Sequence, residues 1–110
     1  MKSGDKLYIV TRKDIDPGYQ AVQSIHAMRQ FSAEHKEADE LWFKESSYLA
    51  LLAVENEKEL LRLAIKAYSQ NIKFSAFFEP DADNEVTAVA FEACDLSKEL
   101  CKSIDLALRQ

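Results

Sequence analysis

The sequence predicts one α/β domain over residues 1–110, a four-stranded mixed β-sheet flanked by helices in the order β-α-(α)-β-α-β-β-α. Two observations predict it. Short apolar runs of strand length alternate with longer segments of helical periodicity. The 110 residues contain only two glycines and two prolines, so the connections between these segments are short. Strands that alternate with helices favour a mostly parallel, centrally buried sheet.

The opening strand and helix are the clearest elements. Residues 7–10 form a continuous apolar run, which suits a strand that is buried on both faces. Asp16 and Pro17 then supply an N-cap and a first-turn proline for a helix that runs to about His35. The residues expected to face the core at helical spacing are Ala21, Val22, Ile25 and Met28.

A polar stripe follows the same helix. At about 100° per residue, Tyr19, Gln23, His26 and Gln30 fall inside an arc of roughly 60°. Most polar stripes are solvated, and a lone histidine is more often structural than catalytic. Because ligands of open α/β sheets bind where a strand turns into a helix, we interpret this stripe as a candidate site above the end of the first strand.

The middle of the chain predicts a short helix or turn over 37–43 and a strand over 49–54. The strand is apolar on both faces, which places it in the middle of the sheet. An amphipathic helix follows, capped by Asn56 and ended by Asn71 in the left-handed conformation. The residues expected to pack on the core from these two helical segments are Leu41, Trp42, Phe43, Leu60, Leu61, Ala64, Ile65 and Tyr68.

The last third predicts two antiparallel strands over 73–78 and 86–91, then a short helix over 95–102. We expect Leu106 and Leu108 to fold the tail back onto the domain.

The connection between these strands alternates carboxylates from residue 79 to residue 85. A calcium-binding loop that starts at Asp81 would need glycine at its sixth position, where Val86 stands. We therefore interpret the connection as solvated and predict no metal site. The sequence also lacks a glycine-rich phosphate loop and a nucleophile-elbow serine, so we predict no cofactor.

Charge and composition limit the partners. The net charge of −5 argues against strong non-specific binding of nucleic acid, and a local basic patch would have to come from Arg12, Lys13, Arg29 and Lys36. No window is apolar enough for a membrane span or a signal peptide, so we expect no membrane partner and a cytoplasmic location. Cys94 and Cys101 have no histidine nearby in the sequence, and we expect free thiols.

Two segments together resemble a known family. Residues 6–15 and 18–27 are similar to the opening of the type 2 (archaeal/eukaryotic-type) peptidyl-tRNA hydrolases, which have a strand ending in Arg-x-Asp-Leu/Ile and a helix with Ala-Gln-x-x-His-Ala. The order of elements also matches over nearly the whole chain. The matching residues are Arg12, Asp14, Gly18, Gln23, His26 and Ala27.

The departures from the family concern its charged residues. Tyr19 stands at the family's lysine position, and residues 79–83 stand where the family has Asp-Ala-Gly-x-Thr, so Glu79 replaces its aspartate. Thr87 stands where the family has a threonine that starts the last strand. The triplet Glu-Pro-Asp at 79–81 resembles a divergent bacterial-type subgroup of this fold.

The resemblance implies hydrolysis of the ester bond of peptidyl-tRNA and a homodimer. It implies that Gln23 orients water or donates to the oxyanion, that Glu79 acts as general base and that Tyr19 donates a hydrogen bond. The implied substrate-binding residues are Arg12, Asp14, Gln20, His26, Asp81 and Thr87. The alternative, favoured by the missing lysine and the acidic net charge, is a non-catalytic binding or regulatory module on the same fold.

Overall fold

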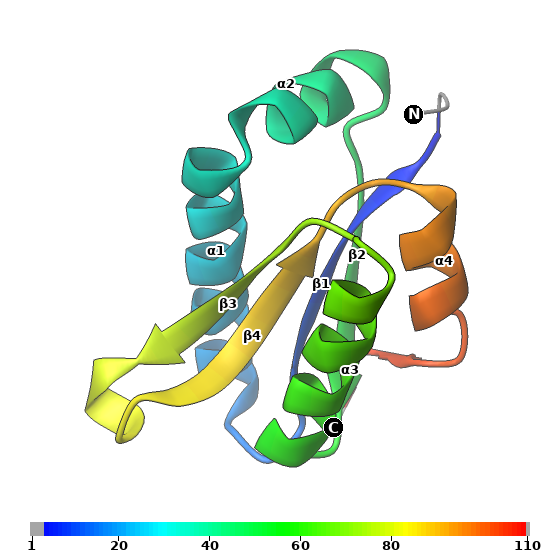
Figure 1. Ribbon diagram of the computed structural model, residues 1–110. Helices are drawn as coiled ribbons and strands as arrows, with labels where there is room; N and C mark the ends of the chain where they lie inside the picture. The colour runs from blue at the N-terminus through cyan, green and yellow to red at the C-terminus, as the bar shows by residue number, and fades with distance from the viewer. Residues whose placement is uncertain (1–3, 110) are drawn as a thin grey trace.

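The computed structural model describes residues 4–109, which form a mixed sheet of five strands and four α-helices (Figure 1). The strands are β1 (Lys6–Arg12), β2 (Tyr48–Val54), β3 (Phe74–Glu79), β4 (Glu85–Phe91) and β5 (Asp105–Leu106). The helices are α1 (Pro17–Glu34), α2 (Lys36–Glu45), α3 (Glu57–Ser69) and α4 (Asp95–Cys101), and a 3-10 turn, η1 (Pro80–Ala82), follows β3.

The predicted α/β class and order of elements are confirmed, with β5 as an addition to the four expected strands. The expectation of a mostly parallel sheet is wrong. The strand order is β3-β4-β1-β2-β5, and within residues 4–109 only the β1–β2 pairing is parallel. The reason is that α3 carries the chain to the far edge, and the β3–β4 hairpin then returns β4 antiparallel against β1.

Helices cover both faces of the sheet. On one face, Leu7 and Ile9 pack in a cluster with residues of α1 and α2, and on the other, Tyr8 and Val10 pack in a cluster with residues of α3 and α4. Figure 1 shows α1 and α3 on these opposite sides. All four strand residues are at most 9% exposed, so the predicted burial of residues 7–10 on both faces is confirmed.

The orientation of α1 differs from the expected one. Val22 and Ile25, expected in the core, are 49% and 61% exposed. The buried residues of α1 are Gln20, Gln23, Ser24, Ala27 and Phe31. Ala27 and Phe31 pack against β1, β4 and Trp42, so they set the rotation of the helix. The buried glutamines find hydrogen-bond partners, which removes most of the cost of burying them.

Two other predicted core faces are partly wrong. On α3, Leu61, Ile65 and Tyr68 are 40%, 69% and 78% exposed, because the helix turns a different side toward the sheet. The buried residues of α3 are Leu60, Ala64 and Ala67.

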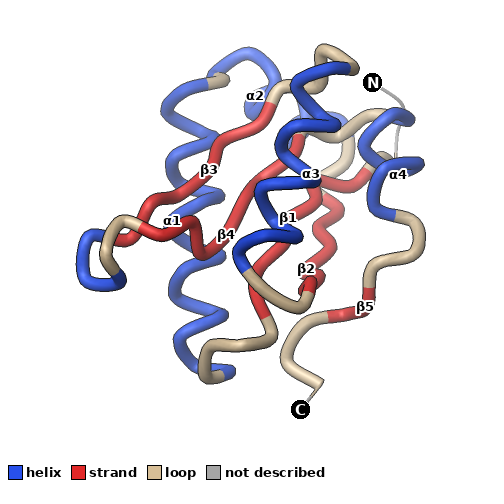
Figure 2. The backbone as a smooth tube through the Cα atoms, turned by 60° about the horizontal axis from the view of Figure 1, so that its bottom comes forward, coloured by secondary structure: helices blue, strands red, loops and turns tan. Residues whose placement is uncertain are grey.

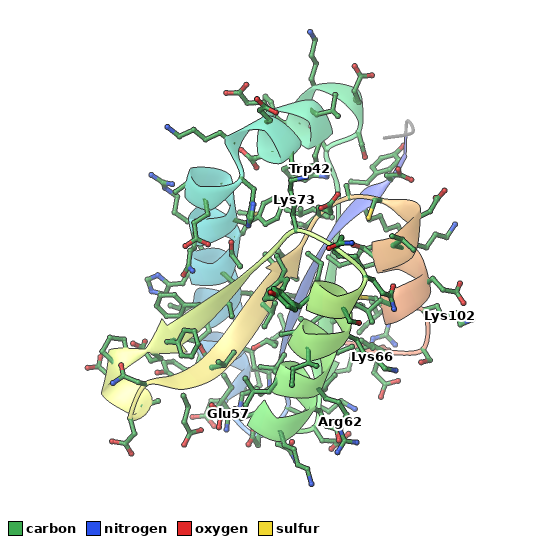
Figure 3. The ribbon with its side chains drawn as sticks, viewed as in Figure 1. Trp42, Glu57, Arg62, Lys66, Lys73 and Lys102 are labelled. Carbon is green, nitrogen blue, oxygen red and sulfur yellow. The ribbon has the colours of Figure 1, made fainter. Side chains whose placement is uncertain are left out.

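On α2, Leu41 and Phe43 are exposed and only Trp42 is buried (labelled in Figure 3). The indole Nε1 of Trp42 donates to the carbonyl of Tyr48 at 2.7 Å.

Both predicted helix signals around α3 are confirmed. Asn56 accepts the backbone NH of Glu59, and Asn71 has a φ of 58°.

Strand β2 lies next to the sheet edge and is not the centrally covered strand that was expected. Its outer side pairs with β5 only at Leu52 and Ala53, because β5 is two residues long. Tyr48 and Leu49, at the start of β2, are 59% and 51% exposed. The tail does return along β2, but Leu106 stays half exposed.

Both cysteines are free thiols, as expected. Burial raises the pKa of the Cys101 thiol to about 12, so this group stays protonated at neutral pH. Among residues 4–109, no helix has the length and apolar character needed to cross a bilayer.

Candidate functional site

A buried chain of hydrogen bonds, the Gln23 network, joins α1 to three strands. Gln23 is 1% exposed; its Nε2 donates to Glu79 Oε1 at 3.0 Å, and its Oε1 accepts from Thr87 Oγ1 at 2.5 Å. Thr11 Oγ1 donates to the carbonyl of Thr87 at 2.9 Å. The nitrogen and the oxygen of the Gln23 amide therefore both have hydrogen-bond partners within the protein, and the Glu79 carboxylate is held in one orientation.

A register shift between β3 and β4 creates this arrangement. Phe77 pairs with Ala88 and Phe78 with Val86, so Thr87 has no partner on β3. Bulges of this kind redirect side chains and are frequent next to active sites. Here the bulge lies beside Gln23, whose amide accepts the Thr87 hydroxyl.

The mouth of the network consists of Tyr19, Glu79 and the η1 turn. Glu79 is 9% exposed, and its Oε2 accepts a long contact, 3.4 Å, from the backbone NH of Asp81. Desolvation raises the pKa of Tyr19, and the negative charge of Glu79 and a hydrogen bond with that carboxylate raise it further. Oε2 and the Tyr19 hydroxyl are thus the groups that a ligand at this mouth would meet.

We expect the Tyr19 phenol to titrate above its ordinary pKa of 10.0 because desolvation disfavours the phenolate and because ionisation would place a second anion beside Glu79. The measurement is an ultraviolet titration of the wild type minus that of Tyr19→Phe. Glu79→Gln should move the Tyr19 transition back toward 10.0, whereas Asp83→Asn, at an exposed acid of the same loop, should not. A Tyr19 transition that ignores Glu79→Gln would contradict this contact.

The polar stripe of α1 runs along the free edge of β3. Only Gln23 connects with the end of β1, through Thr87. The His26 ring is exposed and stacks on Phe77, with centroids 4.5 Å apart and planes at 6°. Gln30 Nε2 donates to the carbonyl of Ala76 at 3.2 Å. Just beyond the end of α1, His35 Nε2 lies 2.9 Å from the carbonyl of Phe74, so side chains from α1 and its C-cap residue occupy outward carbonyls of β3.

Arg12 is occupied by an internal ion-pair cluster, the Arg12 clamp. Its guanidinium binds both carboxylate oxygens of Asp14 at 2.8 Å, Glu85 at 2.7 Å and the carbonyl of Val86 at 3.1 Å. Hydrogen bonding to Asp14 is the main cause of the raised pKa of Arg12. Arg12 and Asp14 are therefore placed to fix the end of β1 against the start of β4.

Gln20 also faces inward. It is fully buried, and its Nε2 donates to the carbonyl of Ile15 at 2.8 Å, which closes the loop between β1 and α1. Its Oε1 has no hydrogen-bond partner among the described residues.

Of the residues that the resemblance assigns to substrate binding, the structure gathers Thr87 at the Gln23 network and Asp81 at its mouth. His26 lies on the stripe, while Arg12, Asp14 and Gln20 serve the β1 end and its loop. Sequence reasoning missed Thr11 and Phe77. Thr11 could have been noticed as a threonine at the end of an apolar strand. No local sequence pattern indicated a role for Phe77.

The four candidates for a local basic patch lie at different places in the fold. Arg12 is in its clamp, and Lys13 Nζ lies 2.7 Å from Asp105 and 3.1 Å from Glu55. Arg29 and Lys36 lie at the other end of α1 and beyond it. Among residues 4–109, no three His, Cys, Asp or Glu side chains gather as a metal site would require.

The surface hollows lie elsewhere. One of about 250 Å³ is lined by α2, Lys73 and residues 92–94, and two others lie at the carboxyl ends of β1 and β2. Their linings include none of Tyr19, Gln23 and Glu79.

Comparison with known proteins informs the fold. No family model matches the chain, and no curated protein matches it. Among solved structures, the chain is similar to a protein of unknown function from Agrobacterium tumefaciens, Atu0240. The TM-score is 0.66 at 15% sequence identity, over 92% of this chain and 96% of that one. At this identity the likeness shows the shared α/β fold alone.

Proposed function

We propose that this chain is a type 2 peptidyl-tRNA hydrolase-like protein of the divergent bacterial type, and that it hydrolyses the ester bond of peptidyl-tRNA at the mouth of the Gln23 network. The observation that carries the proposal is the Glu79 carboxylate. One oxygen is fixed by Gln23, the other has a long contact of 3.4 Å with the NH of Asp81, and the carboxylate also forms a hydrogen bond with Tyr19. A carboxylate held this way is suited to accept a proton from water.

The proposed reaction needs a base and an oxyanion donor. Glu79 Oε2 takes a proton from a water molecule as its oxygen attacks the ester carbonyl. The Tyr19 hydroxyl donates a hydrogen bond to the oxyanion of the tetrahedral intermediate. When the ester C–O bond breaks, the proton on Glu79 passes to the departing ribose oxygen, which leaves free tRNA and a peptide carboxylate. Gln23 is a positioning residue in this scheme because both ends of its amide are occupied.

A second candidate is a binding or regulatory module without catalysis. It is favoured by the charge at the mouth. The residues gathered there are Tyr19, Gln23, Glu79 and Asp81, which supply no cation for a phosphate or an oxyanion. Arg12 is already bound by two carboxylates, and the chain carries a net charge of −5, which repels an RNA backbone.

Release of free tRNA from N-acetyl-aminoacyl-tRNA by the purified protein separates the two candidates. If the chain is a hydrolase, Glu79→Gln should lower kcat by about 100-fold or more and Tyr19→Phe by about 100-fold. The matched Asp83→Asn, an exposed acid four residues beyond Glu79, should retain wild-type turnover.

Absence of turnover above the buffer rate by a folded protein would overturn the hydrolase and leave the binding module. The homodimer implied by the same resemblance belongs to this proposal, and sedimentation velocity on the same samples measures it.

A further inference from the structure

The chain leaves β1 and β2 toward opposite faces of the sheet. After β1 it passes to α1, which packs on the side of Leu7 and Ile9; after β2 it passes to α3, which packs on the side of Tyr8 and Val10. The two strands are parallel neighbours, so the connections diverge at their carboxyl ends. Such a divergence leaves a crevice, which is the usual ligand site of open α/β sheets.

A hollow occupies this place. It has a volume of about 310 Å³, within the range of small-molecule sites. Its lining residues are Lys13, Ala53, Asp105, Leu106, Leu108 and Arg109. A second hollow of about 260 Å³ shares three of them, Lys13, Ala53 and Asp105, so the two hollows are adjacent, and we refer to them together as the crevice. Figure 2 shows where β5 and the C-terminal tail lie relative to β2, with which β5 pairs. Four residues of this segment, Asp105, Leu106, Leu108 and Arg109, line the hollow.

The crevice contains positively and negatively charged side chains that lie close together. Lys13 Nζ lies 2.7 Å from Asp105 and 3.1 Å from Glu55. The lysine side chain is 30% exposed, whereas those of the two acids are 73% and 72% exposed. The stem of the lysine is therefore partly covered while its ammonium lies at the surface, where its exposed partners are readily exchanged or shared with an incoming ligand. Arg109 adds a second cation to the lining.

The apolar wall comes from the tail and includes a strained residue. Leu106 and Leu108 are 50% and 44% exposed, although both line the hollow. Leu108 has a φ of 63°, a left-handed conformation that is unfavourable for a residue other than glycine. Strain of this kind tends to gather where a side chain must be held in a functional position.

We propose that this crevice binds a free α-amino acid with a branched aliphatic side chain. The ligand ammonium binds Asp105, its carboxylate binds Lys13 and Arg109, and its side chain lies against Leu106 and Leu108. A ligand with both charges satisfies both signs of the crevice at once, whereas a ligand with one charge leaves the opposite group without a new partner. The site is independent of the proposed hydrolysis, since none of the Gln23 network lines it.

The test is a two-dimensional amide NMR titration of the full chain with L-leucine, 4-methylpentanoate and 3-methylbutylamine. The two analogues are leucine without its ammonium and without its carboxylate. L-leucine should shift the signals of Ala53, Leu106 and Leu108, and each analogue should bind at least about tenfold more weakly. Asp105→Asn should weaken L-leucine about tenfold, and Asp83→Asn, an exposed acid outside the crevice, should not.

Three results would overturn the proposal. One is the absence of shifts at about 10 mM L-leucine with a folded protein. Another is binding of either analogue as tightly as L-leucine, which would reduce the site to a simple cation or anion site. The third is an unchanged affinity in Asp105→Asn. All are binding measurements, so they are read separately from tRNA release.

Discussion

Ala27→Asp is expected to abolish the folded state of this protein. Ala27 is fully buried and packs with Phe31 against the sheet and Trp42, in a cluster that offers no partner for a carboxylate. An unpaired buried charge costs on the order of 5 kcal/mol, which is comparable to the whole stability of a domain of this size. Circular dichroism and urea unfolding measure the effect.

The matched control lies two residues away on the same helix. Ile25 is 61% exposed, so Ile25→Asp should change the unfolding free energy by about 0.5 kcal/mol or less. The pair tests the rotation of α1 directly. If Ile25→Asp unfolds the protein and Ala27→Asp does not, the apolar face expected from the sequence is the buried one after all.

Arg12→Met is expected to lower the unfolding free energy by about 2–3 kcal/mol. The variant leaves the carbonyl of Val86 and two carboxylates without their shared donor. The cost stays below that of a fully buried pair because the side chains of Asp14 and Glu85 are 40% and 44% exposed and regain water. Urea unfolding at neutral pH gives the value.

The acid dependence of stability distinguishes the clamp from simple packing. Hydrogen bonding to Arg12 lowers the pKa of Asp14 from 3.8. A carboxylate with a lowered folded pKa contributes stability above its unfolded pKa and loses it as the pH falls through the folded value. The gap between wild type and Arg12→Met should therefore be constant near neutral pH and shrink below about pH 4. A gap that persists into acid would assign the effect to packing.

Lys13→Met is the matched control for the clamp. Lys13 is the next residue and also binds two carboxylates, but these are largely in water. We expect a loss too small to separate from measurement error. An equal loss in both variants would mean that burial of the guanidinium is not what distinguishes Arg12.

Structural features that depend on a few adjacent residues could be predicted from the sequence. Residues 7–10 are all apolar, so both faces of this strand favour burial whatever its alignment with the neighbouring strands. Asn56 and Asn71 act through their own backbone neighbours, which makes a cap and a left-handed stop local properties. Glu79 and Gln23, separated by 56 positions, were brought together by the family resemblance, since no local pattern pairs them.

Structural features that depend on residues far away in the sequence could not be predicted. α1 carries apolar residues around most of its circumference, so its rotation is decided by Phe31 and Ala27 fitting beneath Trp42. The burial of Gln20 needs a carbonyl at Ile15 that only the folded loop supplies. β5 is two residues long and exists because β2 offers it an edge; its sequence has no strand pattern of its own.

The two edges of the sheet are unequal as templates for another chain. At β3, the carbonyls of Ala76 and Phe74 already interact with the side chains of Gln30 and His35, so an incoming strand would have to displace these two side chains first. At β2, by contrast, the pairing with β5 begins only at Leu52. A peptide designed to extend this sheet would therefore enter at β2, beside the exposed residues 48 and 49.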